Sequence, residues 1–116
     1  MPNNTPHSIS LEEAIDLTSR FRANRPSFMP ICETYDKASV LEMLNVESAE
    51  KLRIYMGEKA NGNICTVLVA ANGQGNDILP LQEEAIQSMV MDEDALILDD
   101  AVRCPELCPP YSPLNG

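Results

Sequence analysis

Apolar residues near the start of the chain recur about every three or four positions and predict an amphipathic helix that begins after Ser10. They share one face, which we expect to be buried: Leu11, Ala14, Ile15, Thr18 and Phe21. Ser10 and Glu13 have the spacing of a capping box, in which each side chain accepts a hydrogen bond from the other residue's backbone N–H. Pro26 ends the helix, because proline disfavours helical backbone at the preceding residue.

The segment 26–44 predicts an extended stretch followed by a second helix. Pro26 and Pro30 favour an extended path, and residues 31–35 predict a short strand at the edge of a sheet. Asp36 is a suitable N-cap for a helix over 37–44, and Asn45 suits its end. We expect this helix to bury three apolar side chains: Val40, Leu41 and Leu44.

The clearest strand pattern lies in the middle of the chain and predicts a β-hairpin. Three apolar residues alternate with more polar positions, as in a strand with one buried and one solvated face: Leu52, Ile54 and Met56. Asn61-Gly62 predicts a type I′ turn, because that turn needs a positive φ at both central residues. The apolar run over 64–71 predicts a strand covered on both faces or central in its sheet, and residues 77–79 a short return strand.

Periodicity weakens beyond Pro80. Four residues have helical spacing and predict a third helix: Leu81, Ala85, Ile86 and Met89. Residues 92–103 predict an irregular acidic connection or a short strand. We therefore expect a single α+β domain over 10–103, a small antiparallel sheet with a central β-hairpin packed by two or three helices. Residues 1–9 predict a flexible arm, and residues 104–116 an extended Pro/Cys-rich tail packed on the domain.

Charge is unevenly distributed along the chain. The net charge is −10; residues 1–76 hold nine acidic and seven basic side chains, and residues 77–116 hold nine acidic and one basic. Such a field repels phosphate backbones, which argues against nucleic acid, and favours a protein partner with a basic surface.

No segment approaches the roughly 18 apolar residues of a membrane span, and residues 1–8 lack signal-peptide features. We expect a cytoplasmic protein without a membrane partner.

The four cysteines differ in their surroundings. Cys65 lies within the apolar run and predicts a packed core thiol, whereas Cys32 has no clear assignment. Cys104 and Cys108 form a pair, and a helical turn between them places their Cα atoms about 6 Å apart, within disulfide range. Reduced thiols, a local disulfide and a metal site stay open as alternatives. The spacing fits a disulfide better than zinc, which needs four ligands, so we assign no metal and no cofactor.

Candidate catalytic residues are scarce. The single histidine, His7, lies in the predicted arm, so a Ser/His/Asp or Cys/His site would need that arm to be docked on the domain. The acidic run 92–100 departs from the calcium-loop template, and Gly73-Gln-Gly75 lacks the third glycine of a dinucleotide site. Arg53 and Tyr55 share one face of the predicted strand and are either a ligand site or ordinary solvated surface.

Three segments resemble a family of small uncharacterised bacterial proteins of the Bacteroidetes type. They are Ile9–Ile15, Leu52–Gly57 and, most specifically, the tail Arg103-Cys-Pro-Glu-Leu-Cys-Pro-Pro-Tyr-Ser-Pro-Leu-Asn115. The resemblance implies one compact unit with a characteristic tail, and it transfers no catalytic residue.

These observations predict a non-enzymatic binding or protein-interaction module with an acidic surface, which binds a protein with a basic surface or a second copy of itself. Negative charge without catalytic geometry is the reason for this prediction. The alternatives are a thiol/disulfide or metal-binding protein that uses Cys104 and Cys108, and an acidic immunity or inhibitor protein.

Overall fold

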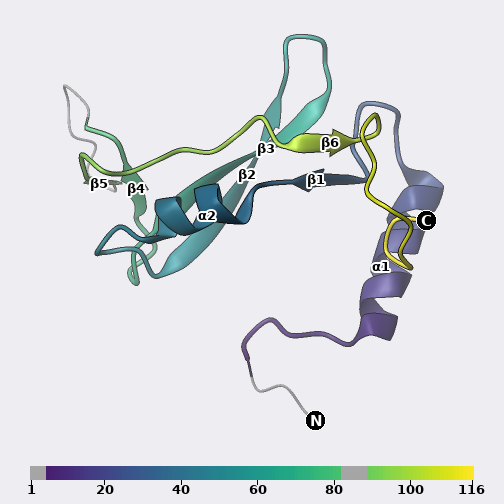
Figure 1. Cartoon of the computed structure of the whole chain (residues 1–116), viewed down its shortest axis with the longest axis horizontal. Coiled ribbons are helices and arrows are strands. Elements are labelled where there is room, and N and C mark those ends of the chain that lie inside the picture. Colours follow the sequence, from purple (N-terminus) through teal and green to yellow (C-terminus); the bar gives the residue numbers. More distant parts are fainter. Residues whose placement is uncertain (1–4, 82–88) are drawn as a thin grey trace.

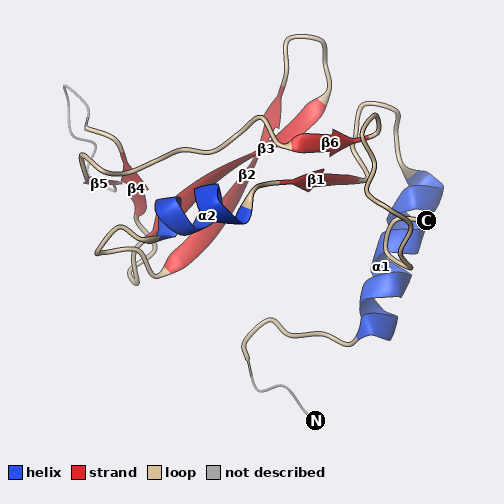
Figure 2. Ribbon diagram, viewed as in Figure 1, coloured by secondary structure: helices blue, strands red, loops and turns tan. Residues whose placement is uncertain are grey.

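The computed structural model describes residues 5–81 and 89–116, and over these residues the chain has the predicted α+β architecture (Figures 1 and 2). A four-stranded sheet with one helix on its face forms the body, and a separate two-stranded ribbon and a second helix lie to one side of it. In chain order the elements are α1 (Leu11–Asn24), β1 (Cys32–Thr34), α2 (Lys37–Leu44), β2 (Lys51–Glu58), β3 (Ile64–Ala71), β4 (Asp77–Leu79), β5 (Met89–Met91) and β6 (Val102–Cys104).

The main sheet has the strand order β2-β3-β4-β5, so that the apolar strand β3 is an inner strand, as predicted. β2 and β3 form the predicted antiparallel hairpin, with Lys51 opposite Ala71 and Glu58 opposite Ile64. β4 is antiparallel to β3, whereas β5 is parallel to β4. The helix predicted over 81–89 lies mostly outside the described residues, and Met89 begins β5.

The hairpin turn differs from the predicted type I′ turn. Gly62 has a φ of 90°, whereas Asn61 is not among the residues with positive φ in the described part of the chain. The Gly62 N–H donates to the Lys59 carbonyl at 2.9 Å, and the Asn61 side chain accepts from the Asn63 N–H at 3.0 Å. The connection is thus longer than two residues, and a single glycine in the left-handed region closes it.

The hydrophobic core lies between α2 and one face of the main sheet. Met43 is fully buried there, and Val46 follows it just beyond the helix. They pack with residues from the sheet and the turn after β5: Leu68, Ala70, Ile78 and Ala95. The prediction that Leu41 is buried is wrong, since 54% of it is exposed, and Val40 and Leu44 only flank the core. Because α2 is apolar at four of the five positions 40–44, its pattern did not define which side faces the sheet.

Helix α1 has the predicted ends. The Glu13 N–H donates to Ser10 Oγ at 3.0 Å, and the Ser10 N–H donates to the Glu13 carboxylate at 3.4 Å, which confirms the capping box. Its predicted burial is wrong, because none of its fourteen residues, all of them described, is buried. Figure 1 shows α1 apart from the main sheet and beside the C-terminal tail, where the Arg22 guanidinium donates to the Leu114 carbonyl. The Cα radius of gyration is 16.4 Å. A compact domain of this length has a radius of gyration of about 13 Å, so this chain is less compact than such a domain.

Candidate binding groove

The apolar side of β2 is exposed, contrary to the prediction from its alternating pattern. The exposed fractions are 44% for Leu52, 56% for Ile54 and 62% for Met56. The register places these residues on the same sheet face as Ala70, Leu68 and Thr66, their partners in β3. The reason is length: an eight-residue helix spans about 12 Å and an eight-residue strand about 26 Å. α2 therefore covers one part of this face and leaves the rest open.

The uncovered part of the sheet face forms a groove with a cavity volume of about 400 Å³. β2 and β3 supply its floor, the segment 29–35 forms the facing wall, and Val40 of α2 closes one end. This volume lies within the roughly 300–1,000 Å³ of ligand sites, which are concave and mainly apolar. We call this site the β2 groove.

Hydrogen bonds attach the wall of the β2 groove to the edge of β3. The Glu33 carboxylate accepts from the Thr66 backbone N–H at 2.9 Å and from the Thr66 hydroxyl. The Tyr35 hydroxyl donates to the Thr66 carbonyl at 2.9 Å. Burial is the main cause that raises the pKa of Tyr35. Because these polar groups are hydrogen-bonded to one another, the exposed surface of the β2 groove is mainly apolar.

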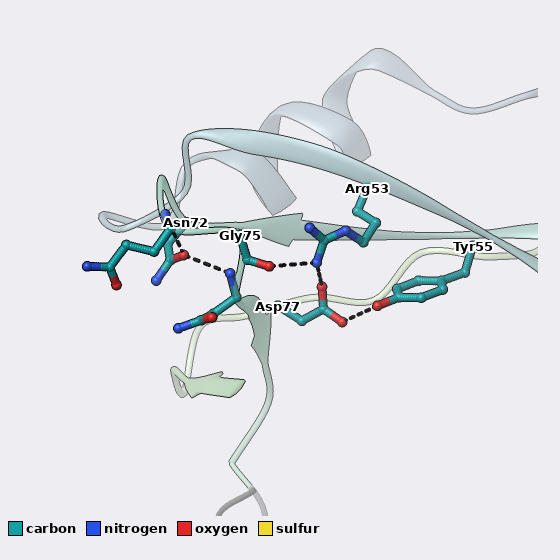
Figure 3. A network of polar contacts seen from close by, with 7 residues as sticks. Arg53, Tyr55, Asn72, Gly75 and Asp77 are labelled. Carbon is teal, nitrogen blue, oxygen red and sulfur yellow. Dashed lines mark hydrogen bonds and ion pairs between the residues drawn. The ribbon is translucent and has the colours of Figure 1, made fainter. Parts of the chain in front are cut away.

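The other face of the sheet carries a polar cluster, shown in Figure 3. The Arg53 guanidinium forms an ion pair with Asp77 and donates to the Gly75 carbonyl at 2.9 Å. The Tyr55 hydroxyl donates to the second oxygen of the Asp77 carboxylate. The pKa of Arg53 and the pKa of Tyr55 are both raised, mainly because each side chain donates a hydrogen bond to Asp77. Arg53 and Tyr55, for which the sequence left a ligand site open, thus have internal partners that connect β2 to β4.

The loop before Asp77 is ordered by a side chain. Asn72 Oδ1 accepts from the N–H groups of Gln74 at 3.0 Å and Asn76 at 2.9 Å. Gly75 has a φ of 91°, a conformation that glycine adopts without steric cost. This turn places the Gly75 carbonyl and the Asp77 carboxylate together in front of Arg53 (Figure 3). The cluster is therefore a structural connection between strands.

The cysteines occupy two regions. Cys104 and Cys108 form a disulfide with a Cα–Cα distance of 4.5 Å, and Cys104 is 1% exposed. Cys32 and Cys65 are free thiols, both half-buried. Cys65 faces Gly57 in the hairpin, whereas Cys32 lies opposite Cys104 in the β1–β6 ribbon. No local pattern predicts that Cys32 and Cys104 are neighbours, because the two strands are far apart along the chain.

The remaining candidate residues from the sequence, His7 and the acidic run 92–100, do not line the β2 groove. His7 is exposed, and the Asp92 carboxylate accepts a hydrogen bond from the Asp94 N–H at 2.8 Å within its own turn. Over residues 5–81 and 89–116, no group of three or more His, Cys, Asp or Glu side chains has the arrangement of a metal site. In the same part of the chain, neither helix has the length and apolar composition that a transmembrane span requires.

Comparison with known proteins identifies no relative of this chain. No protein-family model, no curated protein and no solved structure matches the chain. The resemblance to a family of small bacterial proteins therefore stays a prediction, and the function has to be argued from the groove itself.

Proposed function

We propose that this protein is a non-enzymatic binding module, and that its β2 groove holds a basic, amphipathic helix of a partner protein. One observation carries the proposal: Leu52, Ile54 and Met56 are exposed side by side along a groove of about 400 Å³. Contiguous exposed apolar surface beside polar surroundings is typical of interaction sites. Burial of such a side chain contributes about 1.5–3 kcal/mol.

The form of the partner follows from the sheet. A sheet face is stabilised when a second layer of helix or sheet covers it. α2 already packs on this face beside the groove, so a helix from a partner would complete the layer that α2 begins. Amphipathic helices bind such grooves through apolar residues spaced by three or four positions.

The charge of the partner follows from the chain. The net charge of −10 attracts a basic helix and opposes association with a second, equally acidic copy. Charge attraction raises the rate of encounter, whereas the apolar groove provides the contacts that persist in the complex. The two contributions are separable, which makes the proposal testable.

The experiment uses a synthetic amphipathic helix with one leucine face and one lysine face as the probe, and titration calorimetry as the readout. Two variants are compared, Ile54→Asn in the groove and Leu41→Asn on α2. They remove an aliphatic side chain of nearly the same exposure, 56% and 54%, and neither changes the charge. We expect binding by the natural chain, about tenfold weaker binding by Ile54→Asn, and no change in Leu41→Asn.

Three outcomes would contradict the proposal. The Ile54→Asn variant binds the helix as tightly as the natural chain, or a peptide of the same composition without an apolar face binds equally well. The first result would show that the helix binds outside the β2 groove, and the second that charge alone drives association, as expected of an acidic inhibitor of a basic protein. Sedimentation that shows a dimer lost in Ile54→Asn would assign the groove to a second copy instead.

A further inference from the structure

The β1–β6 ribbon brings a third cysteine to the disulfide of the tail. Cys32 lies directly opposite Cys104 in this antiparallel pair, and Cys104 is bonded to Cys108. Directly opposite residues point to the same side of a β-ladder, with Cβ atoms about 4.5–5.5 Å apart. Their Cα separation of about 4.5–5.5 Å also falls within the range in which a disulfide forms. One sulfur of the disulfide therefore has two cysteines within bonding reach.

We infer that Cys32, Cys104 and Cys108 form a site of intramolecular thiol–disulfide exchange. The Cys32 thiol loses its proton, and the thiolate attacks Sγ of Cys104. The Cys104–Cys108 bond breaks, a Cys32–Cys104 bond forms, and Cys108 leaves as a thiolate that takes up a proton. One disulfide is exchanged for another, so the step needs neither an oxidant nor a reductant.

Burial and position distinguish the roles of the three cysteines. Cys104 is buried within β6, where its carbonyl accepts from the Ile31 N–H at 2.7 Å, and it is the central residue in both disulfides. Cys108 is exposed in the turn beyond β6, which suits a leaving thiolate that needs hydration. Cys32 is half-buried and lines the β2 groove. The exchange would cross-link the ribbon and release Cys108, and it does not depend on the proposed function.

The pairing of Cys32 with Cys104 is tested in a Cys108→Ser variant. The variant is oxidised with oxidised glutathione at about pH 8, where thiolates are available. It is then quenched in acid and mapped by mass spectrometry after trypsin digestion. We expect a Cys32–Cys104 disulfide, in the same yield when Cys65 is also replaced by Ser. Thiols that stay reduced, carry only glutathione, or pair with Cys65 would overturn the inference.

The exchange itself is tested in the natural chain after its Cys104–Cys108 disulfide has formed. The protein is held at about pH 8 without added thiol, and samples taken at successive times are unfolded and labelled with excess N-ethylmaleimide, so that the reagent does not block Cys32 before the exchange. A protease that cuts after Glu106 separates Cys104 from Cys108, so that the label can be assigned to one of them. We expect Cys108 to be labelled in the natural chain and, at an unchanged rate, in Cys65→Ser, whereas Cys32→Ser, which lacks the attacking thiol, should show no labelling of Cys108.

Two further results would overturn the exchange. Cys108 stays unlabelled in the natural chain, or Cys32→Ser is labelled at the same rate. A labelling rate that falls with dilution would also count against it, because it shows exchange between molecules. None of these results bears on peptide binding by the groove, so failure of this inference and failure of the proposed function are distinguishable.

Discussion

Two parts of one sheet face have similar residues and opposite surroundings. Where α2 covers the face, Leu68 and Ile78 are buried against Met43. Where the cover ends, Ile54 and Met56 are mostly exposed, although they belong to the same face. Apolar composition alone therefore does not decide burial. The covered part stabilises the fold, and the open part leaves apolar surface exposed.

The largest expected effect lies in the covered part. Met43→Ala leaves a cavity in the centre of the core and should lower the free energy of unfolding by about 2–5 kcal/mol. Leu41→Ala is the matched control, because it shortens an exposed side chain of the same helix and should cost no more than about 0.5 kcal/mol. Urea unfolding measures both. Equal losses in the two variants would mean that α2 does not face the sheet through Met43.

A smaller effect is expected at the wall of the groove. Tyr35→Phe removes the hydrogen bond to the Thr66 carbonyl and should lower the free energy of unfolding by about 1 kcal/mol. The raised pKa of Tyr35 adds a pH dependence, because the folded chain keeps the phenol proton to higher pH than the unfolded chain. This contribution is present below about pH 10 and is lost as pH rises through the folded pKa.

Unfolding measured on both sides of pH 10 tests the sign of this dependence. Stability of the natural chain should fall as pH rises above about 10, and the fall should be smaller in Tyr35→Phe. A fall of the same size in the variant would show that the Tyr35 phenol does not contribute to it.

The next effect is local and concerns α1. Ser10→Ala removes the capping hydrogen bond to Glu13 and should destabilise the helix by about 1 kcal/mol. Since α1 buries none of its described residues, this loss should barely change the global free energy of unfolding. Hydrogen exchange should show about fivefold lower protection of the α1 amides, with the sheet amides unchanged. An equal loss of protection in β3 would show that α1 and the sheet unfold together.

The smallest effect on stability is expected in the open part of the sheet face. Ile54→Asn replaces a mostly exposed side chain, so the free energy of unfolding should change by no more than about 0.5 kcal/mol. The same substitution should weaken binding of the leucine–lysine helix. A loss of stability as large as that of Met43→Ala would show that Ile54 belongs to the core of the free protein.

Local signals in the sequence predicted the elements well, and the arrangement in space explains what they missed. The capping box and Pro26 bound α1, and Asp36 and Asn45 stand at the ends of α2 as expected, but the Asp36 side chain forms no capping hydrogen bond. Alternation correctly predicted β2 as a strand, but it cannot show whether a neighbouring element covers the apolar face. The contact between Cys32 and Cys104 depends on pairing between distant strands, for which neither residue carries a local signal. The β2 groove depends both on which element covers the sheet face and on the pairing of distant strands, so the local pattern of the sequence could not predict it.

Methyl NMR of the natural chain during titration with the leucine–lysine helix tests whether the open part of the sheet face is the binding surface. We expect the methyl signals of Leu52, Ile54 and Met56 to shift together as the helix binds, whereas those of the equally exposed Leu41 should not shift. Shifts confined to residues outside the β2 groove, with Ile54 unchanged at saturation, would show that the helix binds elsewhere.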